Sequence, residues 1–154
     1  MQKYDIVALG GTFDIIHDGH MKLLNKAFSI SNKAIIGLTS DELAAKKGKN
    51  LLKNYHQRFE SLKSVIEKNF PKSSYEITKL ENDFGPAVIE GSVQALVVSK
   101  ETSNKGRLLN ELRSKGNLPP VEIVVVPMVL AKDGNTISTT RIKNSEIDSS
   151  GNLN

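Results

Sequence analysis

The sequence predicts an α/β domain with a doubly wound, five-stranded parallel sheet and helices on both faces. Two observations predict it. Apolar runs of strand length alternate along the chain with segments whose apolar residues recur at helical spacing. Three of the runs are nearly continuous in apolar residues, as parallel strands covered on both faces are. This alternation favours a parallel sheet with right-handed crossovers, a Rossmann-like arrangement.

The five strands follow one another at spacings that leave room for a helix between most of them. The first, fourth and fifth are the continuous apolar runs, and the third has the weakest pattern. The strands are expected at Tyr4–Leu9, Ala34–Leu38, Tyr75–Leu80, Ala95–Ser99 and Val121–Val126.

The helices are expected where apolar residues recur three or four positions apart, which gives each helix one buried stripe. A glycine and a proline interrupt the pattern at 83–86, and a short helix is expected after them. The predicted helices are Gly19–Ser31, 54–69, Ala87–Glu90 and Thr102–Ser114.

Length and composition fit a single domain. A chain of 154 residues can bury about two thirds of the surface that its unfolded state exposes. We expect the domain to span residues 1–145 and the polar residues 146–154 to fray. The chain has no cysteine, which excludes disulfides, thiolate metal sites and cysteine nucleophiles.

Charge and hydropathy predict a cytoplasmic protein without membrane or nucleic-acid partners. No apolar run reaches the roughly 18 residues of a membrane span, and the N-terminus enters a strand without a secretory signal. The net charge of +4 comes from lysines spread along the chain, which is typical of a solvated surface. A nucleic-acid surface and a local basic pocket for polyphosphate are the alternatives.

Three unusual segments fall at the carboxyl ends of predicted strands, where open α/β sheets bind ligands. They are Gly10–His20, Ser99–Thr102 and Ile137–Ile142. In the first, two glycines free the backbone, and the Thr12 hydroxyl can donate to a phosphate oxygen. The helix expected from about Asp18 would present its first N–H groups to the same anion.

Two histidines stand one turn apart at the start of that helix. His17 and His20 would face the same side, and Gly19 between them would let a flat ring such as adenine lie on the backbone. A zinc pair and two purely structural histidines are the alternatives. Since no third ligand is evident, we predict no metal bound by the protein itself. His56 is expected on the surface.

These residues carry a resemblance. His17-Asp18-Gly19-His20 resembles the HxGH signature of the nucleotidyltransferase superfamily, and Ile137-Ser138-Thr139-Thr140-Arg141-Ile142 resembles its second motif. Within that superfamily the chain is similar to the archaeal and eukaryotic phosphopantetheine adenylyltransferases. The similarity lies in its GGTFD start, in Thr39–Glu42, in Val98–Thr102 and in the Tyr55-x-x-Arg58 helix start. Lys53-Asn54 departs from the family, which often has a proline before the tyrosine.

The resemblance implies transfer of an adenylyl group from ATP to 4′-phosphopantetheine, giving dephospho-coenzyme A and pyrophosphate. The acceptor phosphate would displace pyrophosphate directly, with Mg²⁺ bridging the leaving phosphates. His20 would donate to the α-phosphate, His17 would help to hold the phosphates, and Thr12 would contact the attacking or bridging oxygen. The ATP-binding residues implied are Gly11, Thr12, Phe13, His17, Gly19, His20, Ser99, Glu101, Thr102, Ser138, Thr139 and Thr140.

The acceptor site is expected to use Thr12, Arg58 and a lysine from the loop after the second strand. The resemblance implies that one lysine clamps the acceptor phosphate. We predict Lys47, with solvated loop charges as the reading for Lys46 and Lys49. Arg58 could instead pair with Glu60 or a helix end, and Arg141 could be an ordinary surface residue.

Other functions remain as alternatives. A cytidylyltransferase acting on glycerol 3-phosphate or an FAD synthetase would share the HxGH element. Such cytidylyltransferases typically carry an Arg-Thr pair and a glycine where this chain has Asp133-Gly134-Asn135-Thr136. A module that binds nucleotide or nucleic acid without catalysis is the alternative from another class, although few aromatic residues are present for base stacking.

Overall fold

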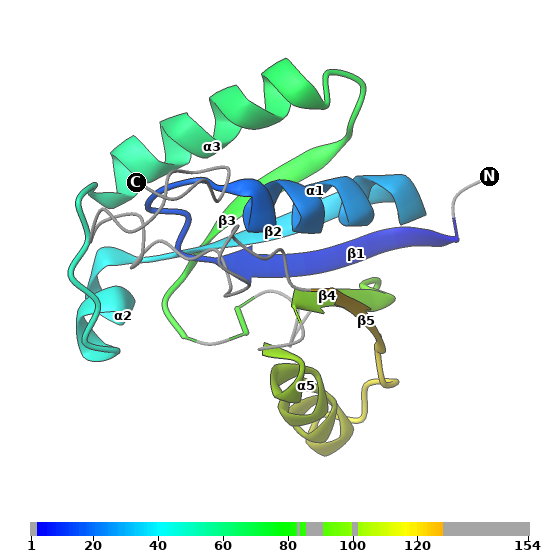
Figure 1. The fold of residues 1–154 in the computed structure, drawn as a ribbon. Helices are drawn as coiled ribbons and strands as arrows, with labels where there is room; N and C mark the ends of the chain where they lie inside the picture. Colours follow the sequence, from blue (N-terminus) through cyan, green and yellow to red (C-terminus); the bar gives the residue numbers. More distant parts are fainter. Residues whose placement is uncertain (1–2, 83, 86–90, 100–101, 128–154) are drawn as a thin grey trace.

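The computed structural model describes residues 3–82, 84–85, 91–99 and 102–127. In those ranges the chain forms five strands and four helices (Figure 1). The strands are β1 Tyr4–Gly11, β2 Ser31–Thr39, β3 Tyr75–Leu80, β4 Ala95–Ser99 and β5 Glu122–Val126. The helices are α1 Asp18–Ile30, α2 Asp41–Lys46, α3 Tyr55–Asn69 and α5 Asn104–Lys115.

The strands form one parallel sheet in the order β3-β2-β1-β4-β5. The order reverses between β1 and β4. Strands β2 and β3 are added on one side of β1, and β4 and β5 are then added on its other side. In an open α/β sheet this reversal opens a crevice at the carboxyl edge of the strands. The predicted Rossmann-like α/β fold is therefore confirmed, and the turn after β1 lies at that crevice.

Helices cover both faces of the sheet. Helices α1 and α3 lie on one face and α5 lies on the other (Figure 1). Successive strand residues point to opposite faces, so Val7 packs in the core with Leu24 and Leu62, whereas Ala8 packs with Leu109. Burial on both faces explains the continuous apolar runs in β1 and β4.

Two local features differ from the sequence prediction. Strand β2 starts at Ser31, directly after α1, and so is longer than the apolar run that predicted it. Helix α2 was not predicted at all. Its six residues are too few to show a helical period, but the Ser40 hydroxyl caps it by accepting from the Leu43 N–H at 3.0 Å.

Several smaller boundaries also shift. Helix α5 begins two residues later than predicted, and β5 begins at Glu122 rather than Val121. The short helix expected at Ala87–Glu90 and the polar tail at 146–154 lie outside the described residues. Among the helices that the structure describes, none has the length and hydropathy needed to cross a membrane.

Candidate active site

The turn that follows β1 brings the backbone into an unusual conformation at Phe13. Phe13 has a φ of 50°, a left-handed conformation that is uncommon for a bulky side chain. Its ring is 1% exposed and lies over Gly11, where a Cβ atom would come within 3.0 Å of the ring. A side chain at Gly11 would therefore crowd the ring. Strain of this kind persists only where the surrounding packing determines it, and it is enriched at functional sites.

Both predicted catalytic histidines cap helix α1. The His17 Nδ1 accepts from the Gly19 N–H at 3.1 Å, and the His20 Nδ1 accepts from the His17 N–H at 3.2 Å. The two rings stack with centroids 3.9 Å apart. Because Nδ1 accepts in each ring, the proton of the neutral imidazole lies on Nε2. Both histidines therefore have the structural role that was the alternative, because the Nδ1 of each ring caps the helix. The Nε2–H of each ring is still a hydrogen-bond donor.

The surroundings of His20 keep it uncharged. Burial, followed by the neighbouring His17 and Lys49, lowers the pKa of His20 to about 3. Burial also lowers the pKa of His17, although Asp18 opposes the shift. The Phe13 ring contributes to this burial, with its centroid 4.7 Å from that of His20. At neutral pH both imidazoles are therefore neutral hydrogen-bond donors rather than cations.

Lys49, from the loop between α2 and α3, contacts the turn after β1. Its Nζ donates to the Thr12 Oγ1 at 3.0 Å. Partial burial of the ammonium and the nearby cations Lys47, Lys105 and Arg58 lower its pKa. Lys47, the lysine that we predicted, is the C-cap residue of α2. Lys49, for which the sequence predicts a solvated loop charge, is an exposed residue whose ammonium also contacts Thr12.

Arg58 supports the backbone of the site and is itself buried. Its guanidinium is fully buried and donates to two backbone carbonyls through NH1, to Thr12 at 2.9 Å and to Thr39 at 2.8 Å. Its Nε donates to the Lys53 carbonyl at 3.2 Å. The sequence predicts a contact between Arg58 and the acceptor phosphate. The structure corrects this prediction, because the buried guanidinium bonds backbone carbonyls and the Asp41 carboxylate instead.

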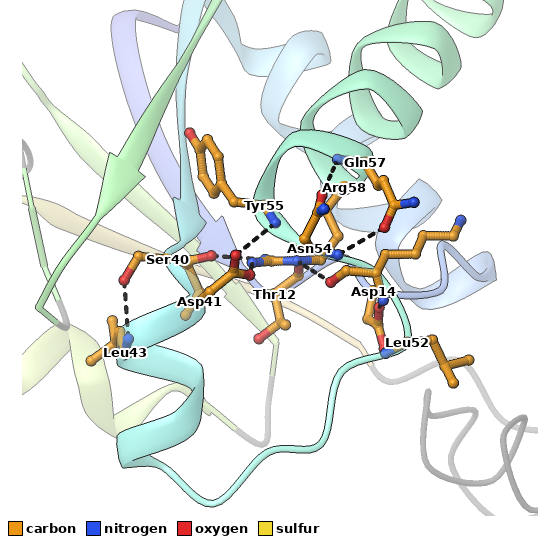
Figure 2. A network of polar contacts seen from close by, with 12 residues as sticks. Thr12, Asp14, Ser40, Asp41, Leu43, Leu52, Asn54, Tyr55, Gln57 and Arg58 are labelled. Carbon is orange, nitrogen blue, oxygen red and sulfur yellow. Dashed lines mark hydrogen bonds and ion pairs between the residues drawn. The ribbon is translucent and has the colours of Figure 1, made fainter.

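Asp41 completes the anchoring of Arg58. The Asp41 Oδ1 accepts from Arg58 at 2.8 Å, and its Oδ2 accepts from the Tyr55 N–H at 3.1 Å (Figure 2). The hydrogen bond from Arg58 is the main cause that lowers the pKa of Asp41. Thr39 adds a bond from its hydroxyl to the Gly11 carbonyl at 3.1 Å. The turn after β1, the end of β2 and the start of α3 are thus joined through one guanidinium.

The remaining predicted residues divide into two groups. At the end of β4, the hydroxyls of Ser99 and Thr102 lie 3.1 Å apart, at the same edge of the sheet as the turn after β1. Glu101 and the second motif lie outside the described residues. The residues of that motif are Ser138, Thr139, Thr140 and Arg141.

Metal ligands are scarce in the part of the chain that the structure describes. There, no three His, Asp or Glu side chains gather in a way that could hold a metal ion. The buried carboxylate nearest the turn, Asp14, instead accepts from two backbone N–H groups.

Sequence reasoning missed the roles of Asp14 and Asp41. Asp14 lies inside the glycine-rich motif, so the signal was present but no partner could be assigned to it. Asp41 follows the capping residue Ser40 and could have been read as the first residue of a helix. Its pairing with Arg58, 17 residues further along the chain, has no signature in the sequence.

Comparisons with known proteins agree with this geometry. A family model described as cytidylyltransferase-like matches residues 8–145. A phosphopantetheine adenylyltransferase of Methanosarcina acetivorans is 44% identical over 150 residues, which cover 96% of this chain and 94% of that protein. The chain belongs to the phosphopantetheine adenylyltransferase family.

Other members and a solved structure extend the comparison. The phosphopantetheine adenylyltransferase of Methanothermobacter thermautotrophicus is 37% identical over 99% of this chain and 91% of its own length. A crystal structure of an Archaeoglobus fulgidus protein of unknown function superposes with a TM-score of 0.71 and is 31% identical, covering 79% of this chain and 88% of that one. The similarity to phosphopantetheine adenylyltransferases is therefore not confined to the two motifs. It extends over nearly the whole chain.

Proposed function

We infer that this chain transfers the adenylyl group of ATP to 4′-phosphopantetheine, producing dephospho-coenzyme A and pyrophosphate in coenzyme A biosynthesis. The observation that carries the inference is the identity of 44% to a relative of that name, over 96% of this chain. The geometry supports it. Two neutral imidazole donors, a hydroxyl and a lysine ammonium belong to the turn after β1 or contact it, and such groups bind phosphates.

The proposed reaction is one in-line displacement. An oxygen of the acceptor phosphate attacks the α-phosphorus of ATP, the new P–O bond forms, and the bond to pyrophosphate breaks. The protein supplies position and electrostatic stabilisation, and no covalent intermediate is needed. We propose that the Nε2–H of His20 donates to the α-phosphate as negative charge builds there, while His17 helps to hold the phosphates.

Lys49 and Thr12 are the proposed contacts for the acceptor phosphate. Because Lys49 donates to the Thr12 oxygen, the hydroxyl proton of Thr12 must point elsewhere and can be donated to a phosphate oxygen. Cations around Lys49 add to the positive potential and favour a dianionic phosphate. We therefore propose Lys49 in the role first predicted for Lys47, with Lys47 contributing at longer range.

The remaining ATP contacts are proposed from the family resemblance. Close backbone at Gly11 and Phe13 would approach the phosphates, and Gly19 would lie against the adenine. Hydroxyls of the second motif would hold the β- and γ-phosphates. The residues in this part of the proposal are Ser99, Glu101, Thr102, Ser138, Thr139 and Thr140.

We propose that Mg²⁺ enters as the MgATP complex. Mg²⁺ is commonly held by substrate phosphates with few protein ligands. The side chains of His17, His20 and Lys49 offer donors that suit the phosphates of such a complex. The ion would neutralise charge on the leaving pyrophosphate. A cytoplasmic location is proposed from the same substrates, since ATP is a cytoplasmic metabolite.

A panel of nucleotides and acceptors tests the function. ATP and CTP are each supplied with 4′-phosphopantetheine, glycerol 3-phosphate or FMN, and pyrophosphate release is followed with mass identification of the product. We expect turnover with ATP and 4′-phosphopantetheine, giving dephospho-coenzyme A. Turnover only with CTP and glycerol 3-phosphate, or only with ATP and FMN, would overturn the proposal in favour of a sibling activity.

A further inference from the structure

Asp14 is a buried carboxylate whose bonds lead to the loop that carries Lys49. It is 2% exposed, and its Oδ2 accepts from the Leu52 N–H at 2.9 Å while its Oδ1 accepts from the Lys53 N–H at 3.0 Å (Figure 2). Ionised side chains are seldom buried without specific partners. Backbone N–H groups that point at a carboxylate are such partners, and these bonds are stronger than neutral ones.

The loop between α2 and α3 is tied down on both sides of Lys49. On the N-terminal side, the backbone N–H of Lys49 donates to the Ala44 carbonyl of α2 at 3.0 Å. After it, Leu52 and Lys53 donate to Asp14. Asn50 and Leu51 alone separate Lys49 from the residues bonded to Asp14, so these bonds restrict where the loop can carry Lys49.

Asp14 and the target of Lys49 belong to the same turn. Thr12 stands two residues before Asp14, and the Thr12 carbonyl is itself held by Arg58. One turn therefore holds both the hydroxyl that Lys49 contacts and the carboxylate that anchors the loop of Lys49. Movement of the loop relative to this turn would separate the ammonium from the hydroxyl.

We propose that Asp14 is a positioning residue, whose buried carboxylate holds the 50–53 segment so that Lys49 is presented to Thr12 where the acceptor phosphate binds. The proposal rests on the function inferred above. Asp14, the aspartate of the GGTFD run, would thus contribute to acceptor binding without contacting the acceptor. In the free enzyme, the Lys49–Thr12 contact is the arrangement that this anchoring produces.

The substitution Asp14→Asn tests the proposal with little change in shape. One carboxylate oxygen becomes an NH₂ group facing a backbone N–H, so the hydrogen bond from either Leu52 or Lys53 is lost. We expect the KM for 4′-phosphopantetheine to rise about tenfold, as for loss of a hydrogen bond to a charged group, with the KM for ATP changed less than about twofold. Equal losses for both substrates would overturn the proposal.

A double-mutant cycle shows whether Asp14 acts through Lys49. Lys49→Ala removes the ammonium, and in that background Asp14→Asn should add less than about twofold to the acceptor KM. Multiplication of the two single effects would show that Asp14 acts by another route and would overturn the proposal. Asp5→Asn is the matched control, because Asp5 is an exposed carboxylate at the opposite end of β1 that accepts from Asn32. Its kinetics should equal those of the wild type.

A second variant leaves Asp14 intact, in case Asp14→Asn does not fold. One glycine inserted between Asn50 and Leu51 lengthens the tether between Lys49 and the anchored residues, and such loops tolerate insertion. We expect the same selective rise in acceptor KM, and a wild-type KM would overturn the proposal.

A wild-type enzyme that forms no dephospho-coenzyme A would instead refute the proposed function. Faster tryptic cleavage after Lys49 or Lys53 in Asp14→Asn would then still report release of the loop, and unchanged cleavage would refute the anchoring.

Discussion

At the residue scale, His20 combines hydrogen-bond donation with the absence of charge. Its Nδ1 is engaged with the His17 backbone, so the neutral ring presents Nε2–H. A donor that is neutral in the resting enzyme avoids the cost of burying a cation beside Lys49. In the mechanism proposed above, its N–H also stabilises the charge that develops on a phosphate oxygen. The ring is also held by Phe13 and His17, which limits the reorganisation needed during the reaction.

Removal of this donor should slow the chemical step. We expect His20→Ala to lower kcat by roughly 10²–10³-fold, as deletion of one oxyanion donor does, while the protein still folds. Steady-state pyrophosphate release measures the rate, and circular dichroism checks the fold. His56→Ala, which replaces an exposed histidine of α3, is the control and should keep full activity. Wild-type turnover of His20→Ala would remove His20 from the mechanism.

The charge state of His20 can be observed directly. Because its pKa is lowered to about 3, its imidazole should remain neutral across the range in which an ordinary histidine with a pKa of 6.5 takes up a proton. Nitrogen-15 chemical shifts of His20 should report the Nε2–H tautomer from about pH 8 to about pH 5, with a histidine-containing peptide in the same buffers as the comparison. A His20 midpoint near 6.5 would contradict the expectation.

At the scale of elements, one buried guanidinium connects three segments of the chain. Arg58 of α3 donates to the carbonyl of Thr12 after β1 and to that of Thr39 at the end of β2, and it pairs with Asp41 at the start of α2. Thr39 is the last residue of β2 and Thr12 follows the last residue of β1, and the guanidinium supplies a donor to both carbonyls. The turn after β1, which we propose binds phosphate, is therefore held in place by residues of α2, α3 and β2.

The pairing of Asp41 with Arg58 should appear in acid unfolding. Since the pKa of Asp41 in the folded state lies below its ordinary 3.8, the carboxylate stabilises the fold above that value, and the contribution is lost as the pH falls through the folded pKa. Urea unfolding between about pH 6 and about pH 2.5 should show a steeper acid loss for the wild type than for Asp41→Asn. Parallel curves for the two proteins would contradict the prediction.

At the scale of the whole molecule, the sheet separates two apolar cores. Leu24 and Leu62 belong to the core under α1 and α3, whereas Leu109 belongs to the core under α5. The strand residues alternate between them. Because helices cover both faces, the loops that follow the strands meet at the carboxyl edge of the sheet.

The second core is tested by two adjacent leucines of α5. Leu109 is fully buried, and Leu108 is 41% exposed. We expect Leu109→Ala to lower the free energy of unfolding by about 2–5 kcal/mol, because it removes buried contacts and leaves a cavity. Leu108→Ala should cost less than about 0.5 kcal/mol in the same denaturant titration. Equal costs for the two substitutions would place the core elsewhere.

Much of the fold was predictable because its signals are local. The apolar runs of β1 and β4 and the helical stripe of α3 lie within a few residues of each strand and helix, and their boundaries were nearly correct. The two histidines were also found from their spacing, because a helix places residues three apart on one side. Helix α2 was missed because six residues carry too little periodicity.

The sequence by itself determined the sheet, its carboxyl edge and the motif that belongs to a family of adenylyltransferases. Only the tertiary structure decided that Lys49 meets Thr12, and that the Arg58 guanidinium is buried against the Thr12 carbonyl. These contacts join residues 37 and 46 positions apart. Neighbouring lysines in a loop are equivalent in a sequence pattern. The folded backbone distinguishes them, because it fixes which ammonium lies within hydrogen-bond distance of the turn.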